Sequence, residues 1–460
     1  MYCSPFPEAA LLTVDGVGEW TTAACGRGTA AWDGVGENRL TLDAELRFPH
    51  SLGLLYSAFT AWLGFEVNEG EYKVMGMAPY GEPKYTDRVR RVVQVYDDGS
   101  LHLDLTYFTF PHHTTRTFSD RFEALFGPSR NPTQRFVTDR TSRFDDHTPP
   151  TREEMERNQH YADVAASIQA VTEDILVRMA RHLHAQTGLR HLCLSGGVAL
   201  NSVANFKILT ETPFEEVYIP PAAGDAGGAL GAALYAYHVL LGQPRRFVLE
   251  HGAWGETHDG ANVVQFLRDA GIRGEQFADE DRLLERTVDL LGQDKVVGWV
   301  QGRFEWGPRA LGHRSILADP RRAEMKDVVN IKIKFREAFR PFAPSVVAER
   351  AGDFFSFPDA ARHLPARFML YVVPVRRPEL LPAVTHADGT GRLQTVPRET
   401  GGRYHRLLER FGQATGVPVL LNTSFNLRGE PIVNTPAEAY STFLRSGMDA
   451  LVLGDWVVVK

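Results

Sequence analysis

The sequence is poor in cysteine and has no long apolar run. Its three cysteines, Cys3, Cys25 and Cys193, form no Cys-x-x-Cys pair, so they supply neither a disulfide framework nor a structural zinc site. No apolar run approaches the roughly 18–20 residues of a membrane span. The first residues also lack the charged and apolar regions of a signal peptide. We therefore expect a cytoplasmic protein that makes no membrane contact.

Positive charge is not in excess either. The chain of 460 residues has 50 lysines and arginines against 57 acidic residues, a net charge of −7, which argues against a broad basic surface for nucleic acid. Hydrophobic residues make up 43% and charged residues 23%, which is ordinary for globular proteins. At roughly 100–200 residues per domain, the length predicts two or three domains.

Apolar runs of strand length alternate with helical periodicity, a pattern typical of α/β proteins with ligand loops at strand ends. The predicted strands cover residues 9–14, 21–26, 29–31, 191–194 and 216–219, and the predicted helices cover 53–63, 151–187, 199–209 and 225–241. We expect the helix over 151–187 to break near Asn158, because a single helix of that length is uncommon. Residues 108–150 are polar and contain prolines, so we expect a long loop there.

A stretch with glycine, proline and arginine between residues 242 and 257 predicts a domain boundary. A second α/β pattern follows it to the last residue. We therefore place a first domain at 1–245 and a second domain at 246–460.

Three glycine-containing loops follow predicted strands, at residues 15–18, 195–201 and 224–228. Glycines let backbone N–H groups approach a phosphate, and the aspartates Asp15 and Asp225 are of a residue type that holds divalent cations. Each loop also has a purely structural explanation: a hairpin turn, tight packing of helix on strand, or a helix N-cap. Together the three loops indicate a nucleotide- or metal-binding domain.

The second half of the sequence holds a basic stretch within an acidic chain. Between Gln301 and Ser345 there are ten lysines and arginines against five acidic residues. A solvated helix face accounts for Lys326 and Lys332, but Arg309 lies among small and apolar neighbours and needs a partner there. An oxyanion such as phosphate matches the fork of its guanidinium group. Arg340 has the same surroundings.

A loop of amides and hydroxyls follows the predicted strand over 419–421. It runs from Asn422 to Asn426 and offers hydrogen-bonding groups to a small polar substrate. A common alternative is an Asx or Ser/Thr turn, in which the same groups bond to their own backbone.

Seven segments of the chain, in order, resemble the O-carbamoyltransferases of nodulation-factor and antibiotic biosynthesis, such as the tobramycin and cephamycin enzymes. They are residues 12–19, 48–53, 72–81, 195–201, 304–312, 388–394 and 422–431. The resemblance covers nearly the whole chain and is weakest over 108–150. It implies an actin-like ATPase (ribonuclease H-like) first domain, N-terminally incomplete, and a YrdC-like second domain.

The resemblance also implies an activity. The second domain of the family makes carbamoyl adenylate from carbamoyl phosphate and ATP, and the first passes the carbamoyl group to a hydroxyl of a natural product or sugar. Transfer takes place near a bound divalent metal, iron by resemblance, with magnesium a further option alongside ATP. A homodimer stays open as the assembly.

The family motifs also imply which residues form the sites. Carried over from the family, Asp15 and Asp225 are the expected metal ligands, and Gly16, Gly18, Gly196, Gly197 and Asn201 are expected to hold the nucleotide in the first domain. The expected catalytic residues of the second domain are Arg309, Lys334 and Arg340, and the expected substrate-binding residues are Arg392, Asn422, Ser424 and Lys73. The role of Lys73 is the least defined of these.

One departure from the family pattern bears on activity. In the family a histidine-containing segment with metal ligands precedes the motif that stands here as Ser4-Pro5-Phe6, and this sequence begins after it. Either the chain is a fragment or mis-started product of a longer gene, which we favour, or a partner supplies the segment. For this chain by itself we expect adenylate formation to survive and transfer to a hydroxyl to be lost. The alternatives are a non-catalytic nucleotide-binding fragment and a threonylcarbamoyl-tRNA-type enzyme, the latter opposed by the acidic balance. Three scattered cysteines exclude the zinc-finger hydrogenase-maturation type.

Overall fold

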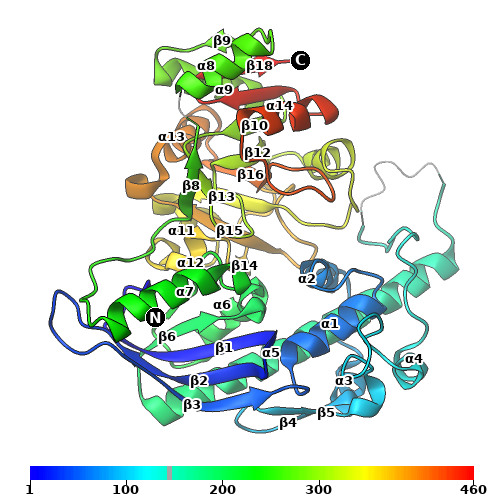
Figure 1. Ribbon diagram of the computed structural model, residues 1–460. Coiled ribbons are helices and arrows are strands. Elements are labelled where there is room, and N and C mark those ends of the chain that lie inside the picture. Colours follow the sequence, from blue (N-terminus) through cyan, green and yellow to red (C-terminus); the bar gives the residue numbers. More distant parts are fainter. Residues whose placement is uncertain (142–147, 259) are drawn as a thin grey trace. The chain divides into compact units, whose positions relative to one another are not determined.

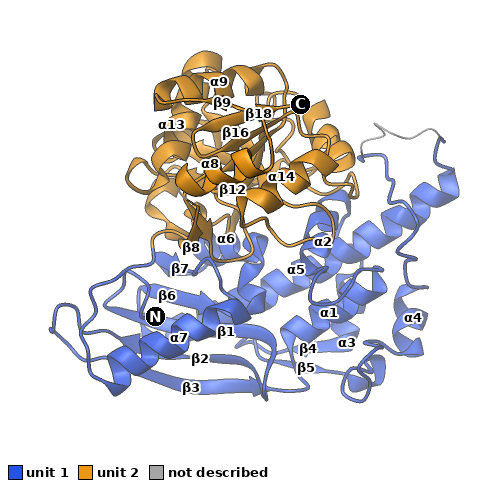
Figure 2. Cartoon of the chain, turned by 45° about the horizontal axis from the view of Figure 1, so that its top comes forward, with its two compact units in different colours: residues 1–141, 147–249 blue, residues 142–146, 250–460 orange. Residues whose placement is uncertain are grey.

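The computed structural model describes residues 1–141, 148–258 and 260–460. The chain divides after Leu249 into two compact units, here unit 1 and unit 2, each with its own sheet (Figure 2). No helix within those described ranges is both long and apolar enough to cross a membrane.

Unit 1 is built on a five-stranded sheet with helices packed against it (Figure 1). The strands of the unit are β1 (Glu8–Gly18), β2 (Thr21–Thr29), β3 (Arg39–Arg47), β4 (Val93–Val95), β5 (Leu101–Leu103), β6 (His191–Ser195) and β7 (Glu216–Tyr218). The α-helices are α1 (Leu52–Trp62), α2 (Glu71–Met77), α3 (Thr86–Val92), α4 (Asp120–Phe126), α5 (Arg152–Thr187), α6 (Ser202–Glu211) and α7 (Gly228–Tyr235). Short 3₁₀ or π turns are η1 (Ala78–Tyr80), η2 (Leu105–Tyr107), η3 (Gly197–Leu200), η4 (Asp225–Gly227) and η5 (Ala236–Leu240).

The order of the strands in this sheet is β3-β2-β1-β6-β7. The first three strands form antiparallel pairs, whereas β1, β6 and β7 run parallel to one another. Because parallel strands end at the same edge of a sheet, the loops after β1, β6 and β7 lie at one edge, where ligands bind in open α/β sheets.

The long helix α5 is uninterrupted over its 36 residues, so the predicted break near Asn158 is wrong. Thr151 caps its start by accepting a hydrogen bond from the backbone N–H of Glu154, and Gly188 ends it in the left-handed conformation at φ 65°. The helix packs along α1, α2, α3 and α6, and Asn158 itself is buried. Tertiary packing along its whole length stabilises a helix that would be marginal by itself.

Two other predictions differ from the structure. Residues 21–26 and 29–31 were expected to be separate strands, but β2 is continuous from Thr21 to Thr29. Gly26 serves close strand approach rather than a turn, since a Cβ there would lie 2.0 Å from the carbonyl oxygen of Thr41 on β3. The region expected to be a long loop contains α4, which buries Phe122 and Phe126, while its residues 142–147 lie outside the described residues.

Unit 2 contains a nine-stranded mixed sheet and a separate two-stranded ribbon. Its strands are β8 (Ala253–Thr257), β9 (Glu275–Gln276), β10 (Val297–Val300), β11 (Arg303–Glu305), β12 (Arg314–Ala318), β13 (Ala343–Val347), β14 (Tyr371–Pro374), β15 (Thr390–Val396), β16 (Val419–Ser424), β17 (Ala450–Leu453) and β18 (Trp456–Val459). Its α-helices are α8 (Gly260–Asp269), α9 (Glu280–Gly292), α10 (Glu324–Asp327), α11 (Ala351–Phe354), α12 (Leu364–Arg367), α13 (Arg398–Thr415) and α14 (Pro436–Arg445). Short turns are η6 (Val328–Ile333), η7 (Ala348–Arg350) and η8 (Ala360–Arg362). Helices α9 and α13 bury leucines and Phe411 against Trp299 and Leu420 of the sheet.

Strand register in the nine-stranded sheet brings several loops to one edge. The sheet order is β14-β15-β13-β16-β12-β10-β17-β18-β9. Strand β16 is antiparallel to both β12 and β13, with Ser424 opposite Ser315 and Asn422 opposite Ala343, while β15 is parallel to β13. The end of β16 and the starts of β12, β13 and β15 therefore share an edge, which we call the cationic edge for the residues described below.

Candidate functional site

In unit 1 the loop after β6 comes into close contact with the backbone of β1. Residues 15–18, predicted as a loop after a strand, belong to β1 itself, whose register with β2 shifts between Val14 and Gly18. Gly196 adopts φ 98°, and a Cβ there would lie 2.1 Å from the carbonyl oxygen of Val14, so the position requires glycine. A Cβ on Gly197 would lie 2.8 Å from Oδ1 of Asp15, and this oxygen accepts a hydrogen bond of 2.8 Å from the N–H of Gly16. The structure thus brings Asp15, Gly16, Gly196 and Gly197 together.

The start of α1 supports the same loop. Ser51 caps the helix, and its hydroxyl donates to the carbonyl oxygens of Asp15 and Gly16 at 3.1 and 2.5 Å. A Cβ on Gly53 would lie 2.5 Å from the N atom of Gly16. Sequence reasoning did not single out Ser51 and Gly53, although both belong to the 48–53 motif, and the signal was a capping serine followed by a small residue at a helix start.

Gly18 and Asp225, the other residues predicted to bind nucleotide or metal here, lie outside this close contact. Gly18 pairs with Thr21 in the β1–β2 hairpin. Asp225 begins η4, and a Cβ on the preceding Gly224 would lie 3.7 Å from Cα of Gly197, so that turn adjoins the loop. Within the described ranges there is no group of three or more histidines, cysteines, aspartates or glutamates that could hold a metal ion. Asp15 and Asp225 are too few ligands for a closed site, so by themselves they do not complete one.

Asn201 is held by other residues of unit 1. Its Oδ1 caps α6 by accepting from the N–H of Ala204 at 3.2 Å. Its amide also pairs reciprocally with that of Gln169 on α5, at 3.0 and 3.1 Å. The hydroxyl of Tyr56 on α1 donates to the same Gln169 at 2.9 Å. These bonds fix the loop after β6 to α1 and α5, and a direct contact of Asn201 with a nucleotide stays a prediction.

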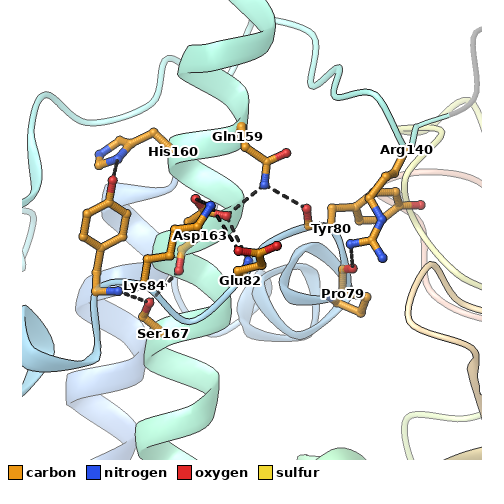
Figure 3. Close-up of polar contacts among 10 residues, drawn as sticks. Pro79, Tyr80, Glu82, Lys84, Arg140, Gln159, His160, Asp163 and Ser167 are labelled. Atoms are coloured by element: carbon orange, nitrogen blue, oxygen red, sulfur yellow. Dashed lines mark hydrogen bonds and ion pairs between the residues drawn. The ribbon is translucent and has the colours of Figure 1, made fainter.

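Lys73 lies on α2, with its Nζ 5.5 Å from the centre of the Phe65 ring. The helix continues through η1 into a segment that α5 holds tightly (Figure 3). Asp163 of α5 accepts from the N–H of Glu82 at 2.9 Å and from Nζ of Lys84 at 3.1 Å. A Cβ on Gly81 would lie 2.1 Å from the carbonyl oxygen of Ala162, so the segment touches the backbone of α5.

Replacing Asp163 with alanine is expected to lower the free energy of unfolding of unit 1 by about 2 kcal/mol, because it removes the carboxylate that accepts hydrogen bonds from Glu82, Lys84 and Gln159. The Asp163 side chain is only 6% exposed, whereas that of Lys84 is 53% exposed. Lys84→Met should therefore have a much smaller effect, since its charge is already in water. Urea unfolding followed by circular dichroism measures the free energy of unfolding of both variants. Equal losses in the two variants would contradict a structural role of the Asp163 carboxylate beyond its ion pair with Lys84.

In unit 2, the loop 306–312 that carries Arg309 is fixed at its far end. Oε1 of the buried Glu305 accepts from the N–H groups of Leu311 and His313 at 2.6 and 2.8 Å. Gly312 adopts φ 109°, and a Cβ there would lie 2.1 Å from the ring of Tyr404. Arg309 itself is half-buried. The loop directly precedes β12 and so lies at the cationic edge.

Lys334 forms hydrogen bonds with the end of β16 and the loop that follows it. Its Nζ donates to the carbonyl oxygens of Ser424 and Asn426, both at 2.8 Å, and to Oδ1 of Asn426 at 2.6 Å. Burial lowers the pKa of Lys334 well below its usual value, and the neighbouring charges of Arg336 and Arg340 lower it further. Two predicted site residues, Lys334 and Ser424, are thus in contact. Asn426 also binds Lys334 but was not predicted as a site residue, although it ends the segment 422–426 that the sequence indicated.

Asn422 is 1% exposed and lies within β16, which continues to Ser424, so the loop predicted over 422–426 begins only after Ser424. Its Nδ2 donates to the carbonyl oxygen of Ala310 at 3.1 Å and to Oε1 of Gln394 at 2.9 Å. Its Oδ1 is buried and accepts from no residue of the described ranges. A substrate contact of Asn422, as predicted, would therefore have to use Oδ1.

Further cationic residues lie at this edge. Arg340 is 7% exposed, directly precedes β13, and forms an ion pair of 3.3 Å with Glu337. Arg392 lies near the start of β15, beside His386, whose pKa falls to about 4 chiefly through burial. Sequence reasoning missed His386, although it lies two residues before the 388–394 motif.

The cationic edge therefore combines several positive side chains with few acids. The residues on its segments are Arg309, Lys334, Arg336, Arg340 and Arg392. Such a cluster suits a substrate with one or more phosphates, since guanidinium groups donate charge-assisted hydrogen bonds to phosphate oxygens. Lys334 instead holds the loop after β16, because its three N–H groups bond to Ser424 and Asn426.

Comparison with known families matches the chain in two parts. The model described as Carbamoyltransferase N-terminus matches residues 1–234, and the model described as Carbamoyltransferase C-terminus matches residues 288–460. Together they span both units.

Individual relatives agree with these matches. The chain is 45% identical over 99% of its length to an uncharacterised protein of Synechocystis and 38% identical over 99% to nodulation protein NolO of Bradyrhizobium diazoefficiens, covering 74% and 76% of these proteins. It is 32% identical over 72% of its length to the 3'-hydroxymethylcephem-O-carbamoyltransferase of Streptomyces clavuligerus, covering 62% of that protein. The chain thus spans about three fifths to three quarters of the length of these relatives.

Proposed function

The chain belongs to the carbamoyltransferase family, and from this premise we propose that it activates a carbamoyl group with ATP, for transfer to a hydroxyl of a small molecule. The resemblance to O-carbamoyltransferases seen in the sequence is confirmed by the family matches and by the nodulation and cephem relatives. Carbamoyl phosphate, ATP and a hydroxyl-bearing acceptor are the proposed substrates.

The observation that carries the proposal is the cationic edge of unit 2. Carbamoyl phosphate and ATP are both polyanions, and Arg309, Arg340 and Arg392 lie on segments of that edge, with Arg340 buried. Positive groups fixed in a partly dehydrated site stabilise charge that develops on leaving phosphate and pyrophosphate. The edge therefore suits the activation step.

The proposed reaction has three steps. Water cleaves carbamoyl phosphate to carbamate and phosphate. A carbamate oxygen then attacks the α-phosphorus of ATP, giving carbamoyl adenylate and expelling pyrophosphate. Finally the acceptor hydroxyl attacks the carbamoyl carbon, AMP leaves, and the hydroxyl proton is released. Adenylation is needed because carbamate by itself is a poor electrophile, whereas AMP is a stabilised leaving group.

We assign activation to unit 2 and transfer to unit 1. An actin-like fold for unit 1 is supported by its sheet of three antiparallel strands followed by two parallel ones, with glycine loops at the parallel ends. A YrdC-like fold for unit 2 is supported by its large mixed sheet. A divalent cation enters the proposal as the magnesium that accompanies ATP and as the ion, iron or a similar metal, that Asp15 and Asp225 would help to hold.

The test is pyrophosphate release from ATP by the purified chain, with and without carbamoyl phosphate. Release that depends on carbamoyl phosphate is the expected result. A chain that is folded by circular dichroism yet releases no pyrophosphate, or releases it equally without carbamoyl phosphate, would overturn the proposal. Such a result would favour a non-catalytic nucleotide-binding protein.

A further inference from the structure

Three strands of unit 2 contribute a buried polar network beneath the loop 306–312. Ser345 of β13, Gln394 of β15 and Asn422 of β16 are 0%, 3% and 1% exposed. Oε1 of Gln394 accepts from the Ser345 hydroxyl at 2.5 Å and from Nδ2 of Asn422 at 2.9 Å. The two acceptor bonds fix the orientation of the Gln394 amide, so its Nε2 has one direction in which to donate.

The remaining donors of this network end on the loop. Nε2 of Gln394 donates to the carbonyl oxygen of Leu311 at 2.8 Å, and Nδ2 of Asn422 donates to that of Ala310 at 3.1 Å. Oε1 of Glu305 also accepts from the N–H of Leu311. The two residues that follow Arg309 are thus held through their carbonyl groups, and Leu311 also through its N–H.

Stability alone does not account for these amides. A buried hydrogen-bonded pair can be replaced by apolar groups of the same shape at little cost, whereas one unmatched polar group is expensive. The sheet could have filled these positions with apolar side chains, as it does at Val346 and Leu420. The polar groups instead hold the backbone of a loop in one conformation, beside the residue that sequence reasoning identified as an oxyanion ligand.

We propose that Gln394 and Asn422 are positioning residues that fix Arg309 for carbamoyl phosphate by holding the carbonyl groups of Leu311 and Ala310. This inference rests on the proposed function. Gln394 touches no reacting atom in it and acts through the peptide groups between itself and Arg309. Without its donor, the loop would lose one of its fixed points, and Arg309 would spend less time in the binding orientation.

The test is a double-mutant cycle on kcat/KM for carbamoyl phosphate, measured by pyrophosphate release. The four proteins are the natural chain, Arg309→Ala, Gln394→Met and the double variant, assayed at enzyme concentrations that register rates about 10⁴-fold below the natural one. We expect Gln394→Met to lower kcat/KM about 10-fold when Arg309 is present and less than about 2-fold when it is absent. Equal losses in both backgrounds, or no loss in either, would overturn the inference.

Two controls separate positioning from folding. Thr287→Val removes a buried hydroxyl of α9 that bonds to Leu283 and leaves the loop untouched, so it should leave kcat/KM unchanged. Gln394→Glu covers the case in which the methionine variant fails to fold: its protonated form donates to Leu311 as the amide does, and its ionised form cannot. Its kcat/KM relative to the natural chain should therefore rise as pH falls, and a flat ratio would count against positioning.

The experiment also distinguishes failure of the proposed function from failure of the positioning role of Gln394. If the natural chain shows no release dependent on carbamoyl phosphate, the proposed function fails. If release is normal and depends on Arg309, but the cycle is additive, only the positioning role of Gln394 fails.

Discussion

Arg309→Ala should lower kcat/KM for carbamoyl phosphate in pyrophosphate release by at least about 100-fold, the loss typical of removing one fixed donor from a developing oxyanion. The guanidinium group lies on a loop held by Glu305, with glycine at position 312 enforced by the ring of Tyr404. These contacts hold the backbone of the loop in place before substrate binds. The measurement is steady-state kinetics with carbamoyl phosphate varied at saturating ATP.

Arg322→Ala is the matched control for this substitution. Arg322 follows β12 at the end opposite to the Arg309 loop, its side chain is 57% exposed, and it pairs with Asp294 and Glu324 on the surface. Surface pairs of this kind contribute little, so kcat/KM should stay within about 2-fold of the natural value. A similar fall in both variants would show that net charge rather than the position of Arg309 matters.

Acidification should destabilise unit 2 through His386 by about 3 kcal/mol between pH 6.5 and pH 4. Burial lowers the pKa of His386 to about 4, with Arg392 and Lys326 lowering it and Asp388 opposing them. In the unfolded chain this histidine titrates near its ordinary value. Between the folded and unfolded pKa values, His386 is protonated in the unfolded chain and neutral in the folded chain. Its contribution to stability is therefore fully present above pH 6.5 and is lost as pH falls toward 4.

The measurement is urea unfolding at pH 7.5, 5.5 and 4.5 for the natural chain and for His386→Asn. The asparagine cannot be protonated, so the variant should lose less stability on acidification, and the difference between the two proteins isolates the contribution of His386 from that of other groups. Parallel losses across the pH range would show that the folded protein accommodates a charged His386.

Much of the local structure could be predicted from the sequence, because short-range signals determine it. The helix predicted over 53–63 is α1, and the capping pair Thr151 and Glu154 starts α5 as expected. The break near Asn158 was predicted wrongly, because the expectation counted the intrinsic cost of a long helix and could not include the packing of α5 against four other helices. The turn predicted after Gly26 failed for a similar reason, since the glycine makes room for a neighbouring strand.

The amino-acid sequence by itself determined the family, the residue types of the two sites and the glycines of the loops, because these are properties of short contiguous motifs. Only the tertiary structure decided which of these residues meet. Gln394 bonds to Leu311 across 83 positions of sequence and Asn422 to Ala310 across 112. Such pairings depend on strand order and register, and a shift of one residue would turn each side chain to the opposite face of the sheet.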